Sequence, residues 1–218
     1  MTMDTKKLSC SDCGQFNCYR QDKEFPRFCL TTEIEADELE RIKELYRTDE
    51  WVSKLAYAAA DIEGTYYGKL TRVEEIIAFA KHIGAKKIGI ATCIGLIEEA
   101  KTFVKILRAK GLEPYSVICK VGSVDKTEVG VPEEKKVKTG CFEALCNPVL
   151  QAEILNREQT ELNVIIGLCV GHDSLFIKYS QAPVTTLITK DRVLGHNPAA
   201  ALYTTGFYYK RLLEPEKE

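Results

Sequence analysis

Cysteine is the residue type in this sequence with the widest chemical scope. The chain has nine cysteines among 218 residues, and they fall into two sets. The first set lies within the first 29 residues and comprises Cys10, Cys13, Cys18 and Cys29. The second set is spread over the rest of the chain and comprises Cys93, Cys119, Cys141, Cys146 and Cys169. Because thiolates both bind soft metals and act as nucleophiles, each set indicates metal binding or covalent chemistry.

The first set has the spacing of a metal module. Cys10 and Cys13 stand in a Cys-x2-Cys pair, from which two thiolates of one tight turn reach a single metal, and Cys18 and Cys29 can complete a tetrahedral four-thiolate site. Four thiolates equally suit a [4Fe-4S] cluster, although this spacing matches neither common ferredoxin pattern. We predict a four-cysteine module over residues 1–31 that holds zinc or [4Fe-4S], because a segment so poor in apolar residues needs a staple.

The second set gains meaning only when the elements around it are placed. Short apolar runs at 87–92, 114–118, 163–168 and 184–188 alternate with helical patterns, which predicts an α/β domain over residues 32–218. We expect three layers around a mainly parallel, Rossmann-like sheet.

Helices lead into this sheet. Two are expected between residues 32 and 67, the first opened by a capping box of Thr32 and Glu35. A third is expected from Thr71, and a later helix is opened by Asn147 with proline behind it.

Three cysteines of the second set close predicted strands. Cys93, Cys119 and Cys169 end the first, second and third strands, so a parallel sheet brings them to one edge. The loop that carries Cys141 and Cys146 can cover the same edge. We predict a cofactor site, with [4Fe-4S] as the expected cofactor, on Cys93, Cys141, Cys146 and Cys169. Cys119 is the weakest member, because it can equally be a packed core residue.

A nucleophile is the alternative role for Cys169. The run Gly167-Leu168-Cys169-Val170-Gly171 has the spacing of a nucleophile elbow, with His172 or His196 as the base. Cys169 and His172 are therefore the predicted catalytic pair. His172 can instead be a metal ligand or a helix-capping residue.

A charged loop follows the fourth strand. Lys190 and Arg192 project from the same edge by topology and can bind an anionic substrate. The alternative is a solvated loop in which Asp191 pairs with its arginine neighbour.

Charge and hydropathy restrict the partners. Lysine and arginine total 30 against 32 acidic residues, the net charge is −2, and no long basic run appears, which disfavours nucleic-acid and anionic-membrane binding. No stretch approaches the ~18 consecutive apolar residues of a transmembrane helix, and no secretory leader is recognisable. We expect a cytoplasmic protein, whose reduced cysteines serve metal or catalysis more than disulfides. The expected partners are a small-molecule substrate or a redox partner, with an oligomer allowed.

Three motifs resemble those of a known family. They are Cys141-Phe142-Glu143-Ala144-Leu145-Cys146-Asn147-Pro148, Gly167-Leu168-Cys169-Val170-Gly171-His172-Asp173 and Lys190-Asp191-Arg192-Val193-Leu194-Gly195-His196-Asn197-Pro198. The chain resembles, over nearly its whole length, the cysteine-rich family with domain of unknown function 1847, which is found mainly in anaerobes and is commonly labelled metal-binding. The resemblance implies cytosolic use in anaerobes and a metal, and it supplies no reaction.

The leading functional prediction is a cytosolic metal-binding protein. In it, the four-cysteine module holds zinc or an iron-sulfur cluster, and the second thiolate site carries redox or sulfur chemistry. Two alternatives belong to other classes of protein. One is a zinc-stapled interaction module with inert edge cysteines, and the other is an enzyme with Cys169 as nucleophile.

Overall fold

A computed structural model describes residues 7–216, and the chain divides into two compact units, Met1–Ala60 and Asp61–Glu218. The predicted module of residues 1–31 falls within the first unit and stays a prediction. None of the helices in the described part of the chain is long and apolar enough to cross a membrane.

The first unit is made of short helical segments and longer helices. Its elements are η1 Cys10–Asp12, α1 Asn17–Arg20, α2 Leu30–Glu33, α3 Ala36–Thr48 and the beginning of α4 Glu50–Tyr66. The predicted capping box of Thr32 and Glu35 is wrong. Thr32 lies inside α2, where its hydroxyl donates to the Cys29 carbonyl, and Glu35 is the N-cap of α3 without a side-chain capping bond. The hydroxyl satisfies a nearby carbonyl instead of a helix amide.

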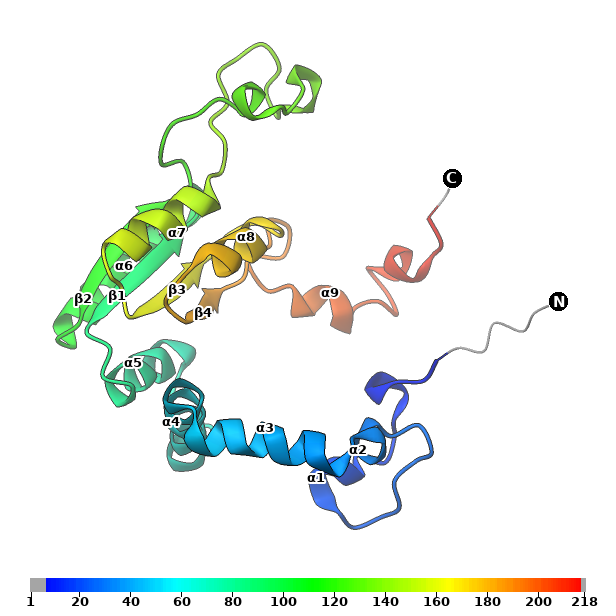
Figure 1. The fold of residues 1–218 in the computed structure, drawn as a ribbon. Helices are drawn as coiled ribbons and strands as arrows, with labels where there is room; N and C mark the ends of the chain where they lie inside the picture. The colour runs from blue at the N-terminus through cyan, green and yellow to red at the C-terminus, as the bar shows by residue number, and fades with distance from the viewer. Residues whose placement is uncertain (1–6, 217–218) are drawn as a thin grey trace. The chain divides into compact units, whose positions relative to one another are not determined.

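The second unit contains the predicted α/β fold. Its elements are α5 Arg72–His82, β1 Lys87–Thr92, η2 Ile94–Leu96, α6 Ile97–Ala109, β2 Glu113–Ile118, η3 Lys126–Val129, η4 Glu133–Lys135, α7 Pro148–Arg157, β3 Leu162–Ile166, α8 His172–Tyr179, β4 Val184–Ile188, α9 Ala199–Tyr203 and η5 Lys210–Leu213. The four strands pair in parallel in the order β2-β1-β3-β4 (Figure 1). The α/β prediction with a parallel sheet is therefore confirmed.

Burial on both faces explains the apolar strands. Ala91, Val117 and Ile165 lie in one core cluster with Leu155 of α7 and Phe176 of α8. Side chains at alternate positions of the same strands face the other way, where α5 and α6 contact the sheet. The central strands β1 and β3 are therefore buried at nearly every position and do not alternate, whereas the edge strands β2 and β4 are more exposed.

Two predicted helix starts are confirmed. The Thr71 side chain accepts the Glu74 amide and the Glu74 carboxylate accepts the Thr71 amide, which is a full capping box. The Asn147 side chain accepts the Leu150 amide, and Pro148 occupies the first turn of α7.

The third strand is shorter than predicted. β3 ends at Ile166, because Gly167 has a φ of +69°, outside the extended region. Cys169 therefore lies in the turn between β3 and α8 and not at the strand end.

The segment between β2 and α7 is ordered by ion pairs. Lys136, whose side chain is 4% exposed, bonds Asp125 at 2.9 Å and Glu133 at 2.8 Å. Lys126 pairs with Glu143, and the Glu143 amide donates to Asp125. The Asn147 amide then donates to the Cys119 carbonyl, at 2.8 Å, so this segment returns to the point where β2 ends.

Candidate functional site

Three cysteines meet at the carboxyl edge of the sheet. Cys93 directly follows β1, Cys119 directly follows β2, and Cys146 stands two residues before α7. Cys93 and Cys119 lie in one core cluster with Cys146 packed against it, and the Cys146 and Cys93 thiols dominate the electrostatics of the Cys119 thiol. Cys93 and Cys119 are buried, at 7% and 2% exposure, whereas Cys146 is half-buried. We call Cys93, Cys119 and Cys146 the three-thiol cluster.

Backbone pairing sets the position of two of these sulfurs. The Cys93 amide donates to the Ile166 carbonyl at 3.1 Å, and the Cys119 amide donates to the Thr92 carbonyl at 2.8 Å. The ladder of the parallel sheet thus continues through both cysteines, although neither belongs to a strand proper. Because the register of the sheet is fixed by its buried side chains, the two sulfurs are held in place by the fold.

Gln151 of α7 hydrogen-bonds the backbone next to the three-thiol cluster. Its side chain is fully buried, and its Nε2 donates to the Thr92 and Val117 carbonyls at 3.2 and 2.7 Å. Its Oε1 is buried without a hydrogen-bond partner among the residues that the structure describes. Sequence reasoning missed this residue. Its only signal was a polar side chain on the apolar side of a predicted helix.

The sulfurs differ in their affinity for a proton. The hydrogen bond from Cys119, together with contacts to basic side chains, lowers the pKa of Cys93 and of Cys146 to about 5. The pKa of Cys119 is raised, because its thiol donates to these sulfurs and its side chain is desolvated. One thiol has one proton, so Cys119 donates to one neighbour at a time. On whichever of Cys93 and Cys146 does not accept this proton, the nearby basic side chain favours the thiolate.

Basic groups lie beside both outer sulfurs. Lys120 Nζ is 3.3 Å from the Cys146 sulfur and also donates to the Ala144 carbonyl. Lys190 lies near Cys93 on the far side of Gly95, and its positive charge contributes to the lowered pKa of that thiol. Sequence reasoning did not assign Lys120, and its place next to Cys119 in the sequence was the available signal.

Cys169 and Cys141 lie apart from this contact pattern. The Cys169 sulfur accepts a hydrogen bond from Arg192 Nη2 at 2.9 Å, and its carbonyl accepts the His172 and Asp173 amides. Cys141 is exposed in the ion-paired segment, where its carbonyl accepts Lys136 Nζ at 3.2 Å. The predicted cofactor set thus contributes two members, Cys93 and Cys146, to the three-thiol cluster.

The two histidines near Cys169 have different surroundings. His172 opens α8, and its Nδ1 is buried with no partner in residues 7–216. His196 Nδ1 accepts the Asp191 amide at 3.2 Å. His196 is therefore engaged within its own loop.

In the loop after β4, Asp191 and Arg192 do not form the ion pair that the sequence allowed. Asp191 Oδ1 accepts the amides of Val193 and Leu194 at 2.9 and 2.8 Å. Arg192 instead reaches the Cys169 sulfur. Asp191 thus shapes the turn, and its arginine neighbour faces the sulfurs.

The N-terminal cysteines occupy a segment with almost no core. Within residues 7–35, the only buried side chain is that of Asn17. Backbone amides of Phe16 and Gln15 lower the pKa of the Cys13 thiol. Across residues 7–216, no three His, Cys, Asp or Glu side chains are arranged so that they could hold a metal ion. The structure therefore does not assemble the predicted four-thiolate site.

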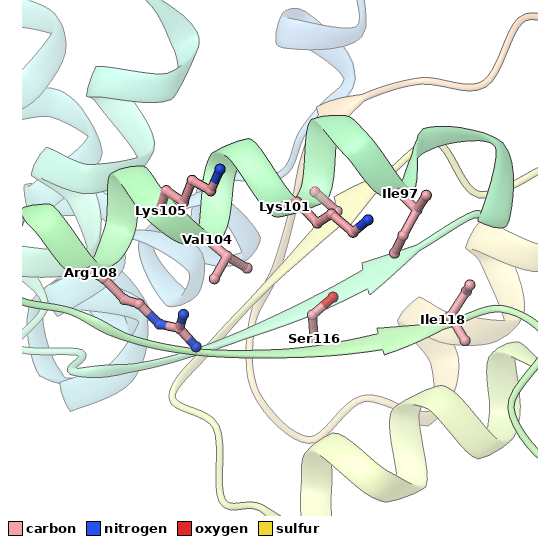
Figure 2. Close-up of a pocket in the computed structure, with 8 residues that line it drawn as sticks. Ile97, Lys101, Val104, Lys105, Arg108, Ser116 and Ile118 are labelled. Carbon is pink, nitrogen blue, oxygen red and sulfur yellow. The ribbon is translucent and has the colours of Figure 1, made fainter.

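A separate hollow lies on the outer side of β2. It measures about 460 Å³ and lies between α6 and β2, with Lys101, Lys105 and Arg108 above Ser116 and Ile118 (Figure 2). No cysteine or histidine lines it. The hollow therefore holds no thiol or imidazole for nucleophilic chemistry.

Comparison with known proteins gives the family. The family model for a protein of unknown function, DUF1847, matches residues 29–187, which is more than half of the chain. The chain belongs to the DUF1847 family. The matched part of this DUF1847 protein includes the whole three-thiol cluster, and the predicted resemblance is confirmed.

One relative of this DUF1847 protein covers almost its full length. It is an uncharacterised protein of the methanogenic archaeon Methanocaldococcus jannaschii, an anaerobe, and is 50% identical over 207 residues. The alignment covers 95% of this chain and 99% of the relative. No solved structure matches the DUF1847 protein.

Proposed function

We propose that this DUF1847 protein carries out thiol–disulfide exchange at the three-thiol cluster. The observation that carries the proposal is the packing of Cys93, Cys119 and Cys146 in one core cluster, in which the Cys119 thiol interacts with both neighbouring thiols. Neighbouring thiols can close into a disulfide without unfolding, provided that their sulfurs already meet. The prediction of redox or sulfur chemistry at this edge of the sheet thereby takes a concrete form.

The solvent exposure of each cysteine indicates whether it is the attacking or the resolving group. Cys146 is half-buried and has the Lys120 ammonium at 3.3 Å, so it is the attacking group. Cys119 is 2% exposed, which keeps external disulfides away from it. Cys119 is therefore the resolving group, and Cys93 is a second sulfur within its reach.

The reaction balances with a small disulfide as the oxidant. The Cys146 thiolate attacks one sulfur of the external disulfide, an S–S bond forms between the two, and the other half leaves as a thiolate that takes up a proton. The Cys119 sulfur then loses its proton and attacks the Cys146 sulfur, which releases the second external thiol. The sum converts two protein thiols and one external disulfide into one protein disulfide and two external thiols.

A reducing compartment suits this chemistry. A cytosol keeps the dithiol form available, whereas an oxidising compartment would lock it as a disulfide. We therefore place the protein in the cytoplasm. The anaerobic habit of the archaeon that holds the relative is consistent with this location.

Trapping of the intermediate tests the proposal. The full chain is treated with 2-hydroxyethyl disulfide under anaerobic conditions, and the adducts are mapped by peptide mass spectrometry. Wild type is expected to form the Cys119–Cys146 disulfide. Cys119→Ser is expected to accumulate a mixed disulfide at Cys146, because the resolving sulfur is gone.

The matched control is Cys141→Ser, which removes an exposed cysteine of the same segment and is expected to behave as wild type. If Cys119→Ser gives no lasting adduct at Cys146, the assigned roles are wrong. An adduct that instead forms first on Cys169 would support the prediction of Cys169 as nucleophile.

Metal binding by the N-terminal cysteines is the second candidate function. It is supported by the Cys-x2-Cys spacing of Cys10 and Cys13 and by the lack of buried apolar side chains in residues 7–35. A segment without a core gains its stability from another source, and in a reducing compartment a bound metal is one such source. Because the structure does not assemble the four thiolates, we derive no reaction step from a metal or cluster.

Anaerobic purification with metal and sulfide analysis tests this second function. About one zinc per chain that is lost in Cys10→Ser supports the zinc staple. Acid-labile sulfide with a broad band near ~400 nm supports a cluster. Sulfide that persists in Cys10→Ser and disappears in Cys146→Ser would support the predicted [4Fe-4S] at the second site. A protein free of metal and sulfide would refute both predictions.

A further inference from the structure

Three cationic side chains surround the sulfurs at the carboxyl edge of the sheet. They come from the segments that follow β2 and β4, and we call them the edge cations: Lys120, Lys190 and Arg192. Lys120 Nζ lies 3.3 Å from the Cys146 sulfur. Arg192 Nη2 lies 2.9 Å from the Cys169 sulfur. Two different sulfurs thus each have a cation within direct contact.

The third cation depends on a glycine. A Cβ added at Gly95 would lie 3.2 Å from Lys190 Nζ and 4.0 Å from the Cys93 sulfur. The absent side chain at this position leaves room for the ammonium beside the sulfur. The Gly95 amide and Lys190 both act to lower the pKa of the Cys93 thiol.

Carboxylates do not neutralise these cations. The ion pairs within residues 7–216 involve none of the three edge cations. The acidic groups nearest in sequence serve the backbone, since Asp191 accepts the amides of its own turn and Asp173 accepts the Ser174 amide. Within residues 7–216 no carboxylate is therefore in ion-pair contact with an edge cation, whereas Lys120 and Arg192 are in direct contact with sulfurs.

We propose that the external reactant at this edge is a small anion, namely a disulfide that carries carboxylate groups. The proposal rests on the thiol–disulfide exchange proposed above. Once Cys119 and Cys146 are joined, the thiolate charge is gone and Lys120 keeps its positive charge. A carboxylate on the reactant and the thiolate that leaves it are both attracted to this field.

Two alkylating probes of nearly equal shape test the charge preference without any disulfide step. Iodoacetate is an anion and iodoacetamide is neutral, and both alkylate thiolates. The ratio of their rates at Cys146 and Cys169 of the full chain is measured by peptide mass spectrometry and divided by the same ratio for a free small thiol. At low salt this normalised ratio is expected to be about ten, and to fall as ionic strength rises.

Substitution of the edge cations completes the test. Lys120→Met is expected to lower the normalised ratio at Cys146 several-fold, and Arg192→Met to lower it at Cys169. Lys178→Met removes an exposed lysine of α8 that contacts none of these sulfurs and should leave both ratios unchanged.

The proposed exchange reaction and the proposed recognition of an anion can be refuted independently of each other. A normalised ratio near one in wild type, or one that ignores both substitutions, overturns anion recognition whatever the disulfide experiment shows. A high ratio without a mixed disulfide at Cys146 keeps anion recognition and refutes the exchange reaction.

Discussion

Cys119 combines burial with contact to two other sulfurs. Its side chain is 2% exposed, and the Ile94 amide donates to its sulfur at 3.3 Å. Hydrogen bonding with the Cys146 and Cys93 thiols and burial raise the pKa of Cys119 against the opposing effect of that amide, so this thiol keeps its proton, whereas Cys146 has a lysine and partial access to solvent. This difference in surroundings lets two cysteines of one cluster play the unlike roles that exchange requires.

The pH dependence of alkylation tests the surroundings of Cys146. Its pKa is lowered to about 5 from an ordinary value of 9.0, so its rate with iodoacetamide is expected to be half-maximal near pH 5 in the folded protein. In urea the half-maximum should move to the ordinary value. Lys120→Met is expected to raise the folded value, because it removes a positive charge that favours the thiolate.

The matched control is Lys135→Met, which removes an exposed lysine of the same segment and should leave the profile in place. The sign for stability follows from the lowered pKa. The thiolate's contribution to folding stability is full above the unfolded pKa and is lost as pH falls through the folded pKa. A folded profile that coincides with the profile in urea would contradict the assignment of Cys146 as the attacking thiolate.

The strands position the sulfurs through close packing of β1 against β3. Gly89 of β1 lies opposite Asn163 of β3 in the register, and an added Cβ would meet the Asn163 Oδ1 at 1.9 Å. Asn163 cannot move away easily, because it bonds Thr160 and Ser180 in the buried interior. Glycine at position 89 is therefore required for the two central strands to pair under α7.

Gly89→Ala is expected to destabilise the protein by about 1–3 kcal/mol, since overpacking forces a buried and hydrogen-bonded side chain to shift. Urea unfolding followed by circular dichroism measures the change. Gly64→Ala is the matched control, because no atom lies within 4 Å of its added Cβ in α4. That substitution should stabilise by about 0.5–1 kcal/mol, and equal effects of the two alanines would refute the packing argument.

The whole chain consists of two compact units with different sources of stability. Asp61–Glu218 has a buried core on both faces of its sheet, whereas residues 7–35 of the first unit bury only Asn17. The second unit can thus be held by apolar burial alone, and the N-terminal segment cannot.

Replacement of Cys10 and Cys13 by serine tests this division. We expect trypsin to cleave after Arg20, Lys23 or Arg27 roughly tenfold faster, because a segment without a staple opens more often. The urea transition of the α/β unit should not move, since none of its core residues is changed. Serine at Cys141 and Cys169 is the matched control, and it should not speed cleavage near the N-terminus. An unchanged cleavage rate in the Cys10 and Cys13 variant would argue against a staple.

The amino-acid sequence by itself determined the class of fold. Its apolar and β-branched runs predicted β1 and β4 to the residue, because β1 is buried at nearly every position and the valine, threonine and isoleucine of β4 favour a strand. The helix starts at Thr71 and Asn147 were equally local, since capping bonds join residues three apart. The same reasoning misplaced the end of β3, where one glycine backbone angle decided the outcome.

Only the tertiary structure decided which cysteines meet. Sequence order placed Cys93, Cys119 and Cys169 at strand ends, yet the contacts join Cys93, Cys119 and Cys146. The return of the segment from Lys120 to Cys146 depends on ion pairs within the segment, Lys126 with Glu143 and Lys136 with Asp125, whose partners are too far apart for any helix or turn pattern to encode. Secondary structure follows from bonds between near neighbours, whereas a reactive site follows from which side chains the folded chain brings into contact.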